Sequence, residues 1–122
     1  MQQTSGTYGC LSLVIPAFRE EKGIGQAIIE AEEALSLLNL TDYEILIIDD
    51  GSSDSTFEAA SQIAKLYKNT KILRHDVNKG YGAALRTGFE AASFEFVAFT
   101  DADCQFYLED LSNLLEAIKM PT

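Results

Sequence analysis

Four short apolar runs, separated by stretches with helical periodicity, constrain the fold of this chain more than any other feature. The runs span residues 11–15, 44–48, 71–75 and 95–100, and each has the length and composition of a buried strand. Strands that alternate with helices form βαβ units with right-handed crossovers, which place the strands in a parallel sheet. The pattern therefore predicts an α/β fold with a parallel sheet of about four strands, the first ended by Pro16.

The remaining stretches repeat apolar residues three and four positions apart, which is the period of one helix face. They predict helices over residues 20–40 and 54–67, a helix of small residues between the loop 78–82 and about Ala92, and a last helix over 108–119. In the first helix, the residues expected to face the sheet are Ile24, Ile28, Ala31, Leu35 and Leu38.

The charge balance limits the partners that the chain can bind. Its 122 residues contain 19 Asp and Glu against 9 Lys and Arg, a formal net charge of −10. Nucleic acids and anionic lipid surfaces attract basic patches, so this balance argues against both. Two cysteines, no signal-peptide pattern and no apolar run of the ~20 residues that span a bilayer favour a cytoplasmic location.

Polar clusters follow all four predicted strands, at residues 16–21, 49–52, 78–80 and 101–105. In open α/β sheets the ligand binds beyond the carboxyl ends of the strands, at a topological switch point. The sequence therefore predicts one binding site built from these clusters. Five acidic residues are expected at its mouth, namely Glu20, Asp49, Asp50, Asp101 and Asp103.

Asp101, Asp103 and Gln105 follow the fourth strand at intervals of two residues. Carboxylate and amide oxygens suit a hard cation such as Mg²⁺ or Mn²⁺, which takes phosphate oxygens as further ligands. The alternative is a solvated acidic turn that caps the next helix. The pattern alone leaves the two interpretations nearly equal.

Asp49 and Asp50 end a buried strand, where two adjacent carboxylates repel each other and are costly to desolvate. An Asx-turn into the next helix explains one of them. Asp50 could instead accept hydrogen bonds from a nucleobase or ribose. Phe18 beside Pro16 could form an apolar shelf for a flat ring, although an aromatic residue there is more often part of a core.

Other polar residues near the strand ends have simpler interpretations. Glu20 and Glu21 are expected to open the first helix, where their charge complements the helix dipole. Lys79 is the cation best placed to contact a ligand, ahead of Arg86. His75, the single histidine, is expected to be a hydrogen-bonded structural residue rather than a catalytic one.

Four motifs in order make the combination recognisable: LVIPAFREE at 13–21, IIDDGSSD at 47–54, NKGYGAALRTG at 78–88 and DADCQ at 101–105. Together they resemble family 2 glycosyltransferases of the GT-A (Rossmann-like) fold, above all the branch of dolichyl-phosphate mannose synthase and bacterial polyprenyl-phosphate glycosyltransferases. The resemblance covers residues 11–119 and implies the strand order 3-2-1-4.

The resemblance also implies site roles. Pro16, Phe18 and Glu20 match positions that line the pocket for the base and ribose. Ile48 and Asp50 match the pair that contacts the base. The positions expected to bind the nucleotide sugar are Pro16, Ala17, Phe18, Glu20, Ile48, Asp50, Lys79, Ala102 and Asp103, and those expected to hold Mg²⁺ or Mn²⁺ are Asp101, Asp103 and Gln105.

The implied activity is metal-dependent transfer of a sugar from a UDP- or GDP-sugar, with inversion, to a polyprenyl phosphate. In this family the acceptor-binding half and any membrane-associated helices follow the Asp-x-Asp segment. We therefore expect residues 1–10 to be a tail and residues 11–122 to be the nucleotide-sugar-binding portion of a truncated catalytic domain, inactive alone. Phe18-Arg19 replaces the usual Tyr-Asn, which keeps the ring but removes the amide.

Three alternatives remain. A receiver-like Mg²⁺-binding signalling domain has a similar length, but it needs an acidic pair after the first strand, where residues 16–18 are Pro-Ala-Phe. A dinucleotide-binding domain needs G-x-G-x-x-G there. The third is a non-catalytic nucleotide-binding domain, which the complete set of Asp101, Asp103 and Gln105 disfavours. In the predicted topology Cys10 and Cys104 lie on opposite rims of the sheet.

Overall fold

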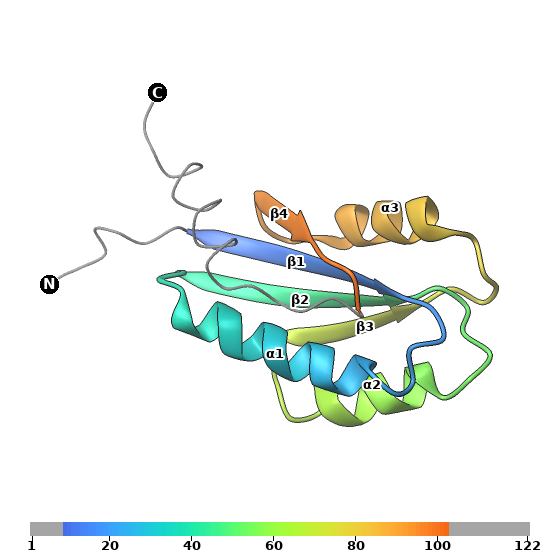
Figure 1. The fold of residues 1–122 in the computed structure, drawn as a ribbon. Helices are drawn as coiled ribbons and strands as arrows, with labels where there is room; N and C mark the ends of the chain where they lie inside the picture. Colours follow the sequence, from blue (N-terminus) through green and yellow to red (C-terminus); the bar gives the residue numbers. More distant parts are fainter. Residues whose placement is uncertain (1–8, 103–122) are drawn as a thin grey trace, which may run out of the picture.

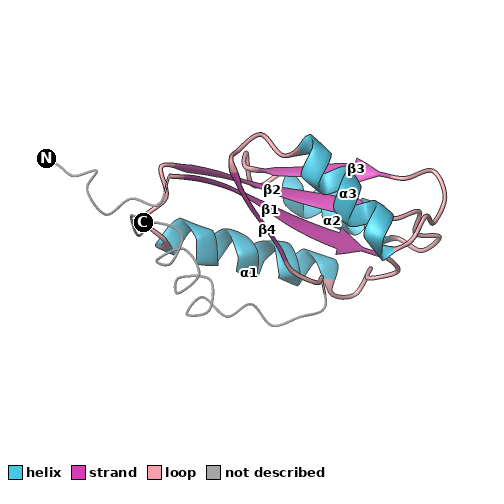
Figure 2. Ribbon diagram, turned by 90° about the horizontal axis from the view of Figure 1, so that it is seen from above, coloured by secondary structure: helices cyan, strands magenta, loops and turns pink. Residues whose placement is uncertain are grey.

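The computed structural model describes residues 9–102, which form one parallel sheet covered by helices on both faces (Figures 1 and 2). Strand and helix alternate as predicted. The elements are β1 (Cys10–Ala17), α1 (Ile24–Leu37), β2 (Asp42–Asp49), α2 (Thr56–Ala64), β3 (Thr70–Arg74), α3 (Tyr81–Ala91) and β4 (Phe96–Phe99). The predicted helix over 108–119 lies outside the described residues.

The order of the strands in the sheet is β3-β2-β1-β4, and each neighbouring pair is parallel. In the central strand, Val14 is paired with Leu46 of β2 and with Phe99 of β4. This confirms the predicted order. A receiver domain has its strands in the order 2-1-3-4-5, so that alternative is wrong.

The helices divide between the two faces of the sheet, with α1 and α2 on one face and α3 on the other (Figures 1 and 2). Leu13, Ile15 and Ile47 belong to the core beneath α1 and α2, whereas Val14 and Leu46 belong to the core beneath α3. Because both faces are covered, β1 is buried at every position from 11 to 17.

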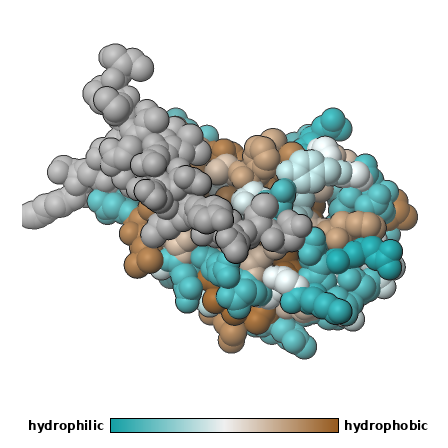
Figure 3. All heavy atoms as spheres, in the orientation of Figure 1, coloured by the Kyte–Doolittle hydropathy of each residue, from teal (hydrophilic) through white to brown (hydrophobic). Residues whose placement is uncertain are grey.

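The helix faces agree with the predicted periodicity. In α1, Ile24, Ile28, Ala31 and Leu35 are buried, and Leu38 packs at the margin of the same core. On the molecular face drawn in Figure 3, hydrophilic side chains are interspersed with hydrophobic ones. No helix within residues 9–102 is long and apolar enough to cross a membrane.

Pro16 lies inside β1, so the prediction that the strand ends there is wrong. In a parallel ladder alternate residues bond to opposite neighbours. Asp50 N donates to Ala17 O on the β2 side, and Thr100 N donates to Val14 O on the β4 side. The next bond on the β4 side would need an N–H at position 16, which proline lacks. Pro16 therefore ends the pairing with β4 but leaves the pairing with β2 intact.

The helix after β1 begins at Ile24 rather than at residue 20. The chain first makes a turn in which Glu20 O accepts hydrogen bonds from the N–H groups of Gly23 and Ile24. Glu21 was expected to open the first helix, but it lies in the turn before α1. Its Oε1 accepts a hydrogen bond from the N–H of Ser55, the residue that precedes α2.

Gly88 brings α3 directly onto the sheet. A Cβ atom at this position would lie 2.3 Å from Val14 Cγ1 and 2.9 Å from Val14 Cγ2, so only glycine permits this separation. Cys10 begins β1, as expected from the predicted topology, whereas Cys104 lies outside the described residues.

Candidate functional site

A cavity of about 470 Å³ lies at the carboxyl ends of the strands. The chain runs from β1 to β2 in one direction and crosses from β3 to β4 in the other, so β1 and β4 form the switch point of the sheet. Segments that follow all four strands line the cavity, as the sequence predicts. The lining residues are Pro16, Ala17, Phe18, Glu20, Asp50, Asn78, Gly80, Tyr81, Ala84, Asp101 and Ala102.

Not every sequence-predicted residue lines this cavity. Ile48 is fully buried in the core beneath α3. Lys79 is exposed, does not line the cavity, and has its Nζ 3.9 Å from Asp76 Oδ1. Asp103 and Gln105 lie outside the described residues. The cavity therefore brings together Pro16, Ala17, Phe18, Glu20, Asp50, Asp101 and Ala102.

The loop after β1 is held by the loop between β2 and α2 and by the first residue of α2. Arg19 N donates to Ser52 Oγ over 2.9 Å, and Glu20 N donates to Thr56 Oγ1 over 2.8 Å. Arg19 has a φ of 56°, a left-handed conformation that turns the chain sharply. Phe18 is 44% exposed and lines the cavity, so it is not a core residue.

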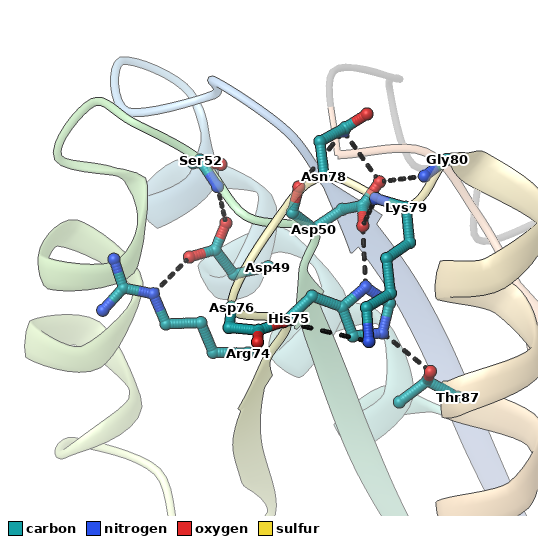
Figure 4. Close-up of polar contacts among 10 residues, drawn as sticks. All are labelled: Asp49, Asp50, Ser52, Arg74, His75, Asp76, Asn78, Lys79, Gly80 and Thr87. Carbon is teal, nitrogen blue, oxygen red and sulfur yellow. Dashed lines mark hydrogen bonds and ion pairs between the residues drawn. The ribbon is translucent and has the colours of Figure 1, made fainter.

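Asp50 is the centre of the densest polar network at this edge (Figure 4). Its Oδ1 accepts hydrogen bonds from His75 Nδ1 over 2.7 Å and from Lys79 N over 2.9 Å. Its Oδ2 accepts from Asn78 Nδ2 and Gly80 N, each over 2.9 Å. The carboxylate is buried and accepts two bonds at each oxygen, so it fixes the loop between β3 and α3.

The same network determines the charge of Asp50. Burial raises the pKa of this carboxyl group, but the hydrogen bonds from His75, Lys79 N–H and Gly80 N–H oppose burial and lower the pKa below its ordinary value of 3.8. Asp50 is therefore ionised at neutral pH.

Gly51 lets the turn after β2 pack against the β3–α3 loop. Its φ is +71°, and a Cβ atom there would lie 2.3 Å from the carbonyl carbon of Val77. The two loops that carry Asp50 and Asn78 therefore touch backbone to backbone. This contact and the Asp50 hydrogen bonds make them one unit.

Asp49 faces the opposite side of the sheet from Asp50, so its expected place at the mouth is wrong. Its Oδ1 accepts a hydrogen bond from Ser52 N over 3.1 Å, which is the Asx-turn that the sequence suggested for one of the pair. Its Oδ2 lies 3.4 Å from Arg74 Nε and makes no hydrogen bond within the described residues. The Arg74 guanidinium stacks on the ring of Phe57 in α2.

Asp101 lies at the edge of the cavity, where its Oδ1 accepts a hydrogen bond from the Tyr81 hydroxyl over 3.0 Å. A carboxylate at this place has the chemistry that a hard cation needs. Within residues 9–102 no three His, Cys, Asp or Glu side chains gather closely enough to hold a metal. Of the predicted set of metal ligands, only Asp101 lies within the described residues.

Sequence reasoning missed four lining residues: Asn78, Gly80, Tyr81 and Ala84. Asn78 and Gly80 belong to a cluster that it recognised, but it chose the charged Lys79 between them. Tyr81 and Ala84 lie in the first turn of α3, and no pattern in the sequence shows that this turn faces the strand ends.

Comparisons with known proteins agree with this architecture. Residues 12–122 match the family described as Glycosyl transferase family 2. The chain is 35% identical over 109 residues to dolichol-phosphate mannosyltransferase of Pyrococcus furiosus. This alignment covers 89% of this chain and 30% of that protein. It is 33% identical over 116 residues to dolichyl-phosphate beta-glucosyltransferase of Saccharomyces cerevisiae, and this alignment covers 88% of this chain and 34% of that protein. The chain thus spans about a third of the length of these relatives.

Solved structures share the fold. The mannosyltransferase PcManGT from Pyrobaculum calidifontis, in complex with GDP-Man and Mn²⁺, superimposes with a TM-score of 0.77 at 22% identity, covering 92% of this chain and 33% of that one. S. aureus TarS in complex with UDP-GlcNAc superimposes with a TM-score of 0.68 at 27% identity, covering 88% and 30%.

Proposed function

Since this chain belongs to glycosyl transferase family 2, we propose that its cavity binds the nucleoside diphosphate part of an activated sugar. One observation carries the proposal: a single cavity combines an exposed aromatic ring, an ionised buried carboxylate and the aspartate of an Asp-x-Asp motif. These groups suit a base, a ribose and a metal-bound diphosphate respectively. The family relationship adds the sugar.

The base and ribose are proposed to bind between Phe18 and Asp50. The exposed Phe18 ring offers a flat apolar surface for stacking, and Pro16 and Ala17 line the same cavity. Asp50 offers carboxylate oxygens, which already hold the β3–α3 loop, so a base N–H would share an oxygen with one of those donors. Glu20 lines the same cavity, and Ile48 lies in the core together with the lining residue Ala84.

The diphosphate is proposed to bind toward Asp101 and Ala102. Asp101, with Asp103 and Gln105, would hold Mg²⁺ or Mn²⁺, which supplies positive charge to a diphosphate leaving group. Lys79 lies between the lining residues Asn78 and Gly80, and its Nζ would have to leave Asp76 to add a second positive charge at a phosphate. This arrangement explains how a chain with a net charge of −10 can bind an anionic ligand.

The proposed reaction is transfer of the sugar to a polyprenyl phosphate with inversion. A bond forms between an acceptor phosphate oxygen and the anomeric carbon as the bond from that carbon to the diphosphate breaks. The acceptor oxygen is already anionic and therefore needs no general base. The relatives named above act on dolichyl phosphates and are about three times as long as this chain. We therefore place acceptor binding, and any contact with the cytoplasmic face of a membrane, in segments beyond these 122 residues.

Calorimetry with UDP-glucose and GDP-mannose, each with and without Mn²⁺, tests this function. We expect weak binding that Mn²⁺ strengthens, and no transferase activity from this chain alone. Asp103→Ala should abolish the effect of Mn²⁺. Phe18→Ala should weaken binding of the preferred nucleotide, whereas Phe89→Ala, an equally exposed phenylalanine away from the cavity, should not.

Three results would contradict the proposal. Nucleotide binding that needs no metal and survives Asp103→Ala would remove the assigned diphosphate site. Equal losses from Phe18→Ala and Phe89→Ala would show that stacking in the cavity does not contribute. Measurable sugar transfer by this chain would overturn the assignment of the acceptor site to other segments.

A further inference from the structure

We propose that His75 is a positioning residue that fixes the Asp50 carboxylate, and with it one wall of the nucleotide pocket. The proposal rests on the function above, in which Asp50 contacts the base. His75 follows β3, does not line the cavity, and would therefore act through Asp50 rather than on the ligand.

The hydrogen bonds of His75 determine which nitrogen of its ring carries the proton. Nδ1 lies 2.7 Å from Asp50 Oδ1, and Nε2 lies 2.8 Å from Thr87 Oγ1 in α3. An ionised carboxylate can only accept, so Nδ1 must carry hydrogen. In the neutral ring Nε2 is then an acceptor, and the Thr87 hydroxyl donates to it. The ring is thus held at both ends by hydrogen bonds, and it is buried.

The position of the ring governs the orientation of the carboxylate. Asp50 Oδ1 is shared by His75 and Lys79 N–H, while Oδ2 is held by Asn78 and Gly80. If the carboxylate rotated toward solvent, it would break bonds to the loop that carries Asn78 and Gly80, both of which line the cavity. His75 connects this loop to the interior of α3 through Thr87 (Figure 4).

No other side chain offers the same pair of contacts. The rigid ring places a donor toward Asp50 and an acceptor toward Thr87 on opposite sides. An asparagine amide has the reach of Nδ1 and a glutamine amide that of Nε2, so each substitution keeps one contact. A ligand that contacts Asp50 would bind more tightly, because the carboxylate is already held in one orientation before the ligand binds.

The first test uses the native chain. His75 is its single histidine, so ¹⁵N spectra of the ring report on this residue alone. We expect the Nδ1–H tautomer and a slowly exchanging ring proton. Addition of the preferred nucleotide, UDP or GDP with Mn²⁺, should shift the ring resonances because the ligand engages Asp50. An Nε2–H tautomer, or ring signals that do not move when nucleotide binds, would overturn the proposal.

The second test separates positioning from stability. His75→Asn, His75→Gln and Thr87→Val are compared by nucleotide affinity and by urea unfolding. We expect His75→Gln to weaken nucleotide binding about tenfold, which corresponds to ~1.4 kcal/mol. His75→Asn should retain more affinity because it can still donate to Asp50. Thr87→Val, which preserves side-chain shape, should cause a loss of a few fold and serves as the variant if the histidine variants do not fold.

Glu44→Gln is the matched control. Glu44 is a buried carboxylate at the other end of the sheet, where it binds Ser12 and Ser93 N–H. This variant should lose stability without losing nucleotide affinity. If the His75 and Thr87 variants behave in the same way, their role is structural only and the proposal is wrong.

The variant Asp50→Asn distinguishes a failure of the proposed base contact from a failure of the positioning role of His75. If Asp50→Asn weakens binding and the His75 variants do not, the proposed base contact stands and the positioning role is refuted. If Asp50→Asn binds nucleotide as the native chain does, the base contact fails and the role of His75 fails with it. Losses in both, with stability retained, support both.

Discussion

The Tyr81 hydroxyl donates a hydrogen bond to Asp101 Oδ1 over 3.0 Å, which joins the first residue of α3 to the segment after β4. Both residues line the cavity. Gly80, the residue before Tyr81, is held in turn by Asp50. Two hydrogen bonds, joined by the backbone between Gly80 and Tyr81, therefore connect the proposed base contact to the proposed metal ligand.

Tyr81→Phe should weaken the binding of Mn²⁺ with nucleotide. The loss of one hydrogen bond of ~0.5–1.5 kcal/mol predicts a reduction of about 2- to 10-fold in affinity. Calorimetry with and without Mn²⁺ measures it, and the loss should appear only when the metal is present. Tyr67→Phe, at the margin of the core under α1 and α2, is the control and should bind normally. Equal losses with and without Mn²⁺ would show that Tyr81 does not act through Asp101.

Two glycines of α3 should respond to alanine in opposite ways. Gly88→Ala would place a Cβ atom 2.3 Å from Val14 Cγ1, which should lower the free energy of unfolding by about 1–3 kcal/mol. Around Gly82 a Cβ atom would meet nothing within 4 Å. Gly82→Ala should therefore raise the free energy of unfolding by up to ~1 kcal/mol, because alanine has the higher helix propensity. Urea unfolding measures both. Equal effects at the two sites would mean that α3 does not approach β1 as closely as described.

Glu44 should make stability depend on acid pH. Burial raises the pKa of this carboxyl group, but hydrogen bonds from Ser12, Ser93 N–H and Lys71 outweigh burial and lower it below the ordinary value of 4.5. Because the folded-state pKa is below the unfolded one, the unfolded chain binds more protons between the two values. The stabilisation is complete above pH 4.5 and is lost as the pH falls through the folded-state pKa.

Urea unfolding of the native chain and of Glu44→Gln checks this expectation. At neutral pH the variant should be less stable by about 1–3 kcal/mol. Both oxygens of Glu44 accept hydrogen bonds, and the amide nitrogen of glutamine cannot accept the bond at the position that it takes. The difference should shrink as the pH is lowered below 4.5. A difference that stays constant down to pH ~3 would contradict the assigned cause, because linkage requires it to change.

Tyr43 should ionise later than an ordinary tyrosine. Burial, followed by the hydrogen bond to Glu32 and the charge of that residue, raises the pKa of Tyr43 to about 12. Ultraviolet titration should show one of the five tyrosines ionising well above 10.0. Glu32→Gln should lower this pKa, and Tyr43→Phe should remove the late step. A single transition of all tyrosines near 10.0 would refute the contact.

The general position of the site could be predicted from the sequence because parallel strands bring their carboxyl ends to one edge. Residues 16–18, 20, 50 and 101–102 could therefore be expected to meet without any knowledge of packing, and they line one cavity. The contribution of Tyr81 could not be predicted in this way. It depends on how α3 packs against the sheet, where Gly88 permits a close approach to Val14.

Predictions based on neighbouring residues were also wrong where a side chain binds a segment that is distant in the sequence. Glu21 precedes α1, so its charge suggested a role in that helix, yet it binds the N–H at the start of α2. Asp49 and Asp50 are adjacent, yet the alternation of a strand sends them to opposite faces. Only the partners on each face, Arg74 for one and His75 for the other, separate their roles.

Pro16 gives the opening at the switch point a physical origin. A residue with an N–H at that place would add one rung between β1 and β4 beyond the bond from Thr100 N to Val14 O. Without that rung the two strands are free to diverge one residue after Val14, and the cavity lined by Pro16, Asp101 and Ala102 lies where they part. The cavity at the switch point thus begins where the backbone lacks a single hydrogen-bond donor.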